Sequence, residues 1–179
     1  MNITGGKYNS LTIKTADFAN IKPTLSKIRQ AVFNSIAAQG EYRTFCDLFA
    51  GSGIMTFEAI SRDYETISVE IDKKSANFIK NNAEKLKIPV NLINYDAVKF
   101  LQKTDKTFDI FYLDPPYKSD LYNKALFEIA NRNLLNKDGV IVLEKPYSVK
   151  VDLNGFECLK EKKYSDKVIM FLKNKSPEN

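Results

Sequence analysis

The sequence predicts an α/β protein built on a doubly wound, mostly parallel sheet. Short apolar runs alternate with helical stretches from residue 44 to residue 145, and strands that alternate with helices at this spacing pair in parallel through right-handed crossovers. The region 156–173 then holds two β-prone runs with no helix between them, so we expect an antiparallel hairpin to close the sheet. At 179 residues and 44% hydrophobic content, the chain can build one core but hardly two.

The first forty residues are expected to extend this domain rather than to form another. The segment ITGGKYNSLTI has short β-prone runs broken by glycine and asparagine, which predicts a small hairpin or an irregular arm. Apolar side chains at helical spacing predict a helix over residues 25–38, with Thr24 as its N-cap and Gly40 beyond its end. We therefore divide the chain into a basic arm with a helix (1–40) and a main α/β region (41–179).

The remaining elements follow from the alternation of apolar runs and helical periodicity. Each apolar run is short and bounded by polar or glycine-containing segments, as strands are. The expected strands cover residues 44–49, 66–71, 90–95, 108–113 and 139–145, followed by the two strands of the hairpin, which turn near Ser165-Asp166. The expected helices cover residues 54–61, 73–86, 97–102 and 121–131.

Composition excludes several kinds of chemistry. The chain has no histidine, which rules out Ser-His triads, histidine general bases and histidine-ligated zinc. Cys46 and Cys158 are far apart in the sequence, so we expect two buried thiols in a reducing compartment and no metal site. No stretch of the sequence approaches the roughly 18 consecutive apolar residues of a membrane span, and the N-terminus lacks the apolar segment of a secretory signal. We therefore expect a soluble cytoplasmic protein without membrane contact.

Charge gives the first indication of a partner. Lysine and arginine outnumber aspartate and glutamate by 27 to 22, a net charge of +5, which favours polyanionic ligands without requiring them. In the first thirty residues the acidic side chain is Asp17 alone, and the basic ones are Lys7, Lys14, Lys22, Lys27 and Arg29. Charge by itself favours a nucleic-acid contact and a merely solvated lysine-rich surface about equally.

A ligand-binding turn is expected after the first strand, in the segment DLFAGSGIMTF. Gly51 and Gly53 let the backbone approach a ligand closely and direct the first amides of the next helix toward it. The third glycine of the dinucleotide fingerprint is replaced by Thr56. A buried carboxylate at Asp47 would repel a pyrophosphate but pair with the amino group of S-adenosylmethionine. A hydride-transferring oxidoreductase is therefore disfavoured.

Two further acids end the next two strands. Glu70 lies where a carboxylate can accept hydrogen bonds from both ribose hydroxyls of a nucleoside, and Asp96 lies where one can accept from the exocyclic amine of adenine. Taken singly, each acid fits a turn or a helix cap, and Asp96 could simply cap the following helix. Acids at the carboxyl ends of three successive strands are better explained by one ligand in the crevice there.

The fourth strand ends in Asp114-Pro115-Pro116-Tyr117, and this turn carries the predicted chemistry. The lone pair of an exocyclic base amine is delocalised into the ring, so a methyltransferase must localise it. A carboxylate and a backbone carbonyl that each accept one N–H direct that lone pair at the methyl group of the cofactor. The prolines stiffen the turn, and Tyr117 offers a flat face to a base lifted from its stack. The proton can then leave to Asp114 or to water.

Taken in order, DLFAGSG, SVEID, NYDA and LDPPY resemble the S-adenosylmethionine-dependent amino-methyltransferases. The segments ITGGKYNSLTI and KPTLSKIRQAVFNSI are similar to the bacterial family that methylates N2 of a guanine in small-subunit (16S) ribosomal RNA. The resemblance implies a Rossmann-like class I methyltransferase fold with seven strands, S-adenosyl-L-methionine as cofactor, and the element around Thr24 closing over it. It also implies a basic arm that approaches RNA, with contact candidates at Lys7, Lys22, Lys27 and Arg29.

The implied partner is small-subunit ribosomal RNA, naked or within an assembling 30S particle, and the expected state is a monomer. Lys22 stands where that family usually has arginine, which keeps the charge but loses the bidentate fork. Ser10 stands where a glycine is expected, and Ser26 and Gln30 stand where aspartate and glutamate are usual.

Two alternatives stay open at the level of sequence. The catalytic turn serves guanine N2 and adenine N6 equally, so N6-adenine methylation of DNA or RNA is one alternative. A noncatalytic RNA-binding module that keeps the fold is the other, although it gives no reason for an acid and an aromatic ring at Asp114 and Tyr117. Methylation of protein glutamine is disfavoured, because asparagine is usual at the first position of such a turn.

Overall fold

A computed structural model of the chain describes residues 1–14, 23–116 and 120–175, with the backbone alone for residues 23–25. The described residues form a seven-stranded sheet in the order β3-β2-β1-β4-β5-β7-β6. Its strands are β1 (Thr44–Asp47), β2 (Glu65–Val69), β3 (Asn91–Ile93), β4 (Phe108–Leu113), β5 (Leu135–Pro146), β6 (Phe156–Tyr164) and β7 (Lys167–Asn174).

The pairing of the strands confirms the predicted doubly wound sheet and its closing hairpin. Strands β1 to β5 pair in parallel, whereas β7 pairs antiparallel with both β5 and β6. The chain order reverses between β1 and β4, so the carboxyl ends of these two strands border the crevice where ligands bind in such sheets. The turn of the hairpin falls at Ser165, which takes a positive φ of 53°.

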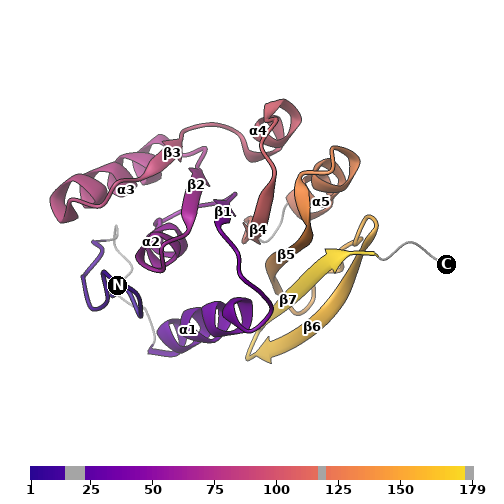
Figure 1. Cartoon of the computed structure of the whole chain (residues 1–179), viewed down its shortest axis with the longest axis horizontal. Helices are drawn as coiled ribbons and strands as arrows, with labels where there is room; N and C mark the ends of the chain where they lie inside the picture. Colours follow the sequence, from indigo (N-terminus) through magenta and orange to yellow (C-terminus); the bar gives the residue numbers. More distant parts are fainter. Residues whose placement is uncertain (15–22, 117–119, 176–179) are drawn as a thin grey trace.

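Helices cover both faces of the sheet (Figure 1). They are α1 (Pro23–Ala37), α2 (Ile54–Ser61), α3 (Lys73–Leu86), α4 (Ala97–Lys103) and α5 (Leu121–Asn131). Side chains of α1 and α2 pack on one face of the central strands, and those of α4 and α5 pack on the other. All five helices fall within two residues of their predicted bounds.

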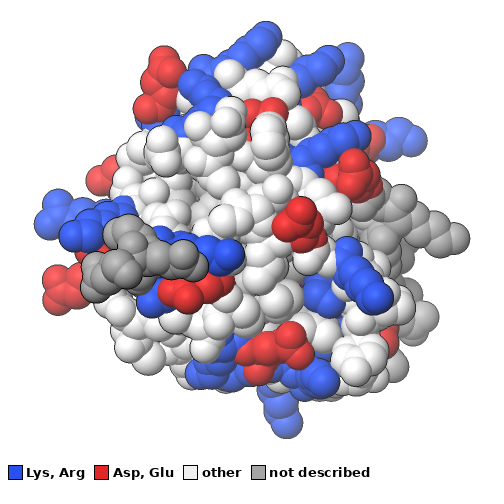
Figure 2. Space-filling model, turned by 90° about the vertical axis from the view of Figure 1, so that its right-hand side faces the viewer, with Lys and Arg blue, Asp and Glu red and all other residues white. Residues whose placement is uncertain are grey.

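The surface carries charges of both signs. On the face that Figure 2 shows, basic side chains lie mainly around the margin with acidic ones among them, and the middle is largely uncharged. The excess of positive charge is thus not gathered into one block on this side of the molecule. Among the residues that the structure describes, no helix is both long and apolar enough to cross a membrane.

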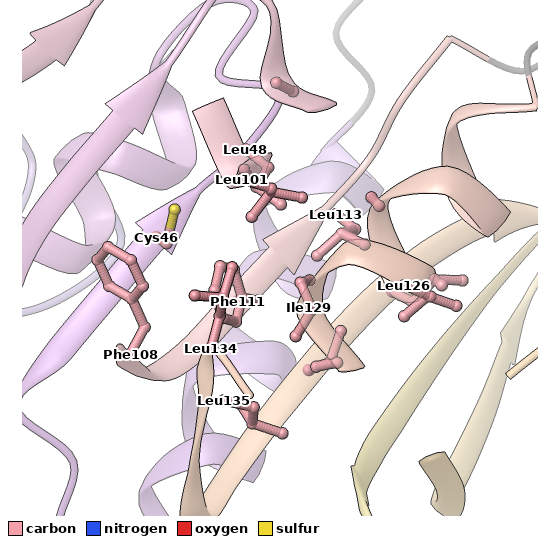
Figure 3. Packing of buried hydrophobic residues seen from close by; sticks show 14 of the residues in the cluster. Cys46, Leu48, Leu101, Phe108, Phe111, Leu113, Leu126, Ile129, Leu134 and Leu135 are labelled. Carbon is pink, nitrogen blue, oxygen red and sulfur yellow. The ribbon is translucent and has the colours of Figure 1, made fainter. Parts of the chain in front are cut away.

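The larger part of the core lies between the sheet and α5 (Figure 3). Phe111 and Leu113 of β4 meet Leu126 and Ile129 of α5 there, all of them fully buried. Alternate residues of β4 face opposite sides, so a strand covered on both faces is apolar throughout. This explains why β4 reads as an unbroken apolar run and is followed at once by a polar turn.

The two cysteines differ in their surroundings, and one prediction is wrong. Cys46 is buried in the core, as expected, but Cys158 is exposed. Cys158 lies on β6, the edge strand of the sheet, whose outer residues have no covering layer. The alternation of residues along an edge strand does not reveal which of its faces is covered.

The first fourteen residues form an irregular arm fastened to α2, in line with the expectation for this segment. One antiparallel bridge joins Asn2 to Thr12, and the amide of Lys7 donates to the carbonyl of Ser61 at 2.7 Å. A Cβ atom on Gly6 would lie 1.8 Å from that same carbonyl oxygen, and Gly6 has a φ of +77°. Only glycine allows the arm to lie this close to the end of α2.

Candidate active site

The carboxyl ends of four parallel strands border a cavity of about 380 Å³. This volume lies within the range of small-molecule sites. The wall combines apolar side chains, among them Leu48, Val69 and Ile71, with a few polar groups. Of the residues that the sequence analysis assigned to ligand binding or catalysis, it includes Gly51, Glu70, Asp96, Asp114, Pro115 and Pro116.

Glu70 lies just beyond β2, and its carboxylate is held by backbone amides. One oxygen accepts from the amide of Gly51 at 2.6 Å, and the other accepts from the amide of Asp72 at 2.7 Å. The residue is 9% exposed, so these two bonds fix the carboxylate in the cavity wall. Because a carboxylate has about four acceptor positions, it can still accept two hydroxyl groups of a ribose.

Glycine is required for a different structural reason at each of the two glycine positions of the loop. Gly51 lines the cavity with a φ of +52°, and a Cβ atom there would find its nearest neighbour 3.9 Å away. Gly53 has a φ of +79°, and its Cβ atom would lie 2.8 Å from a side-chain carbon of Ile79 on α3. Gly51 thus leaves room for a ligand, whereas Gly53 allows close packing of α2 against α3.

Asp47, at the end of β1, is a buried acid with an unsatisfied oxygen. Its Oδ2 accepts from the hydroxyl of Thr56 at 2.7 Å, and its Oδ1 has no hydrogen-bond partner among the described residues. Burial raises the pKa of Asp47 to about 7, with a further contribution from the charge of Glu70. A cationic group close to Oδ1 would supply the missing partner, although Asp47 is not among the residues that line the cavity.

Asp96 caps the following helix and also lies in the wall of the cavity. Its Oδ1 accepts from the amide of Lys99 at 2.8 Å and so caps α4. The same residue lines the cavity. A capped carboxylate has further acceptor positions, so the cap does not exclude a ligand contact.

Asp114 ends β4 and is the most perturbed group of the catalytic turn. Burial, followed by the negative charge of Glu144, raises the pKa of Asp114 to about 7, while Lys167 opposes this shift. Tyr122 of α5 links the turn to β5, because its hydroxyl lies 3.5 Å from the carbonyl oxygen of Pro115 and 3.2 Å from that of Glu144. Pro115 is buried and Pro116 is exposed, and Tyr117 lies outside the described residues.

Asp114 also borders a second cavity, of about 270 Å³, on the side of the sheet covered by α1 and α2. Its apolar wall includes Ile28, Ile54 and Met55, and its polar wall includes Tyr112, Glu144 and Lys167. The sequence analysis assigned no role to these three polar residues. The available signal was Glu144, an acid within the apolar run GVIVLEK.

The candidate RNA contacts fall into three groups. Lys7 and Lys27 are exposed, and Lys7 pairs with Asp63 at 2.7 Å. Lys22 lies outside the described residues, as does the side chain of Thr24. Arg29 is 6% exposed.

Arg29 is not an exposed contact for the RNA backbone: it is buried, and it lines the second cavity. Its Nε donates to the buried Glu58 at 3.0 Å, and its Nη2 donates to the carbonyl of Asn2 at 2.8 Å. The helical period of α1 turns this side chain toward α2 instead of toward solvent. Arg29 therefore ties the arm and α1 to the body of the protein.

Comparison with known proteins agrees with the fold and shows the family of the chain. A family model described as "Conserved hypothetical protein 95" matches residues 1–173. A ribosomal RNA small subunit methyltransferase D from Buchnera aphidicola is 33% identical over 148 residues, which cover 81% of this chain and 76% of that protein.

Two solved structures are also similar. A putative methylase from Haemophilus influenzae has a TM-score of 0.80 and 26% identity, covering 97% of each chain. A Thermus thermophilus 16S rRNA N2 methyltransferase, in complex with AdoMet and guanosine, has a TM-score of 0.73 at 19% identity and covers 98% of this chain and 49% of that one. The chain therefore belongs to the family described as Conserved hypothetical protein 95, that of the ribosomal RNA small subunit methyltransferase D proteins.

Proposed function

We propose that this protein transfers a methyl group from S-adenosyl-L-methionine to the exocyclic N2 of a guanine in small-subunit ribosomal RNA. One observation carries the proposal: Asp114 borders both cavities. A group between two ligand sites is where the reacting atoms of two substrates would meet. The name of the relative from Buchnera aphidicola supports ribosomal RNA as the substrate class.

The first cavity fits the proposed cofactor. Glu70 would accept the ribose hydroxyls, Asp96 would accept from the adenine amine, and the open space at Gly51 would admit the methionine part of the molecule. The unpartnered Oδ1 of Asp47 favours a cationic group nearby. When bound, S-adenosylmethionine supplies an electrophilic methyl group on a sulfonium sulfur.

The chemical task of the protein is then to orient the amine. The carboxylate of Asp114 would accept one N–H of the guanine N2, which localises the lone pair and directs it toward the first cavity. A new N–C bond forms as the C–S bond breaks, and the nitrogen loses one proton to Asp114 or to water. Tyr122 holds the turn against β5 during this step through its bond to the carbonyl of Glu144.

The finer features of the substrate complex belong to the same proposal. We infer that the enzyme acts in the cytoplasm as a monomer, on naked RNA or on an assembling 30S particle. The exposed Lys7 and Lys27 would approach the phosphate backbone, together with Lys22.

The first experiment is methyl transfer from radiolabelled S-adenosylmethionine to 30S particles, naked ribosomal RNA and duplex DNA in parallel, followed by nucleoside analysis. The expected product is N2-methylguanosine from small-subunit RNA. Label in N6-methyladenine would keep the mechanism and overturn the substrate. No label with cofactor bound would favour the noncatalytic RNA-binding module.

Asp114→Asn separates the role of the carboxylate from the shape of the turn. The variant should lose methyl transfer by at least about a hundredfold, because an amide can place its N–H₂ against the amine of the substrate. Its affinity for S-adenosylmethionine, measured by calorimetry, should stay within a few-fold. A loss of cofactor affinity with intact turnover would contradict the assignment.

A further inference from the structure

Glu144 is a buried acid placed beside another acid, and the fold alone does not require it. The residue is 7% exposed. One of its oxygens accepts from the hydroxyl of Tyr112 at 2.6 Å, and the other is paired with Lys167. A buried ion pair of this kind is weak evidence of a contribution to stability, and the charge of Glu144 also opposes ionisation of Asp114. Such a cluster in a cavity indicates a ligand.

The sheet sets the order of the polar groups along the wall of the second cavity. Leu113 of β4 pairs with Leu143 of β5, so Asp114 and Glu144 follow at equivalent positions on neighbouring strands. Lys167 begins β7, the next strand in the sheet, opposite the end of β5. Across three adjacent strands the wall of the second cavity therefore presents two hydrogen-bond acceptors, Asp114 and Glu144, followed by a donor, Lys167.

We propose that Glu144 and Lys167 read the Watson–Crick edge of the target base, with Glu144 accepting the N1–H of guanine and Lys167 donating to its O6. This inference rests on the proposed function and names the residues that give it base specificity. The edge of guanine presents, in order, the N2 amine, the N1–H and the O6 acceptor. The wall presents Asp114, Glu144 and Lys167 in the matching order.

The same arrangement rejects adenine. If its N6 amine occupied the position beside Asp114, its N1, which is an acceptor, would face the carboxylate of Glu144. Two facing acceptors cannot form a hydrogen bond, so both would be buried without a partner. Sites that are built to bind a donor of the substrate strongly reject analogues that lack it. The catalytic turn by itself does not distinguish the two bases, and Glu144 supplies the missing distinction.

The apolar part of the cavity suits a flat base. Ile28 of α1 and Met55 of α2 line it together with Ile54, so a purine placed there would have its faces against aliphatic side chains and its edge against the polar wall. The aliphatic side chains come from the helices, and the polar side chains of the proposed reading edge come from the sheet. Arg29 of α1, which is held by Glu58, and Ser52 also line the cavity. Such a combination of few polar groups in an apolar pocket fixes the orientation of a ligand.

The test compares guanine with 2-aminopurine at the methylated position. 2-Aminopurine keeps the N2 amine but has an acceptor at N1 and only hydrogen at C6. Each base is introduced by ligation into whichever form of the RNA the wild-type enzyme methylates, and kcat/KM is measured for both. The wild-type enzyme should prefer guanine by about ten- to a hundredfold or more.

Two variants locate the preference. Glu144→Gln should lower the preference for guanine over 2-aminopurine, as the ratio of their kcat/KM values, at least about tenfold. The reason is that the glutamine amide can donate a hydrogen bond to the N1 acceptor of 2-aminopurine. Lys167→Met should slow the reaction with guanine by a larger factor than the reaction with 2-aminopurine, since only guanine has an O6. The two rates are compared on the high-pH plateau, because loss of Lys167 also raises the pKa of Asp114. The matched control is Lys173→Met, at the opposite end of the same strand, which should change neither rate.

The outcomes separate the inference from the function on which it rests. No methylation of the guanine RNA by the wild-type enzyme would refute the proposed function. Methylation of guanine and 2-aminopurine at equal rates would leave that function intact and overturn the inference. Equal losses on both bases in Glu144→Gln would also overturn it, because a structural role alone would leave the ratio unchanged.

Discussion

Asp114 shows how the surroundings of one residue set its chemistry. The sequence identifies it as a carboxylate at the end of a buried strand, and that position already implies desolvation. The structure adds the charge of Glu144 at the neighbouring position of β5, and together they raise the pKa of Asp114 to about 7. The carboxyl group therefore ionises near neutral pH, and the proposed methyl transfer would use its ionised form as an acceptor.

Methyl transfer should consequently depend on pH through an acidic limb. Below the pKa of Asp114 its carboxyl group is protonated and loses acceptor capacity, so kcat/KM should rise with pH and level off above about pH 8. The measurement is single-turnover methyl transfer at constant ionic strength. In Glu144→Gln the limb should move to lower pH, since removal of a negative neighbour lowers the pKa of Asp114. A profile flat from about pH 5.5 to pH 8.5 would contradict the assigned role.

Ser10 is a second residue whose surroundings matter. It stands where a glycine was expected, and its backbone has a φ of +69°, a conformation that costs a residue with a side chain about 1–2 kcal/mol. Ser10→Gly should therefore raise the free energy of unfolding by about 0.5 kcal/mol, after allowance for the greater freedom of glycine in the unfolded chain. Denaturant titration beside Ser10→Ala as control tests this, and a less stable glycine variant would refute it.

At the scale of elements, one buried acid joins the arm, α1 and α2. Glu58 on α2 is 0% exposed and pairs with Arg29 from α1 and with Arg62 one turn along its own helix. It also accepts from the amide and the hydroxyl of Thr4 in the arm. Because the arm has little regular structure, this network and the packing of Ile3 and Ile13 hold it in place.

Replacement of Glu58 should weaken the contacts that hold the arm, α1 and α2 together. Glu58→Ala leaves buried arginine charge without its partner, and we expect it to lower the free energy of unfolding by about 3–5 kcal/mol. Equilibrium denaturation measures the loss, and limited proteolysis should find the arm cleaved earlier than in the wild-type protein. Glu161→Ala, at an exposed site on β6, is the control. A change below about 1 kcal/mol in Glu58→Ala would show that the network is dispensable.

At the scale of the whole molecule, acids line a cavity of a protein whose net charge is positive. The acids assigned to ligand binding lie at the carboxyl edge of the sheet, while the net charge of the chain is +5. The overall excess of basic charge favours approach of a polyanion, and in the proposed function the acids at the sheet edge would face uncharged or cationic parts of the ligands. The two requirements are compatible because those acids border a cavity, whereas Lys7 and Lys27 are exposed on the surface.

The salt dependence of RNA binding tests where the polyanion lies. Replacing both Lys22 and Lys27 with alanine should weaken binding and reduce the slope of log K against log salt by about 0.7–0.9 for each phosphate that the variant no longer neutralises. The control is Lys106→Ala, an exposed lysine that precedes β4 and so lies at the opposite edge of the sheet. An unchanged slope in the double variant would show that RNA binds to a surface that does not include Lys22 and Lys27.

The sequence by itself determined the order and type of the elements and the position of the catalytic turn. Helical periodicity, apolar runs and turn residues are local properties, so the bounds of α2, α3, α5 and β4 follow from short stretches of chain. Acids at strand ends were also predictable, because parallel strands bring their carboxyl ends to one edge. Six of the assigned residues accordingly line one cavity: Gly51, Glu70, Asp96, Asp114, Pro115 and Pro116.

Only the tertiary structure decided which charges are enclosed and with what partners. Arg29 reads as one more cation of a basic segment, yet it is buried because Glu58 on another helix faces it. Glu144 and Lys167 are 23 residues apart and meet because β7 pairs with β5. The physical reason is that burial and pairing of charges depend on neighbours across the fold, whereas sequence patterns record mainly neighbours along the chain.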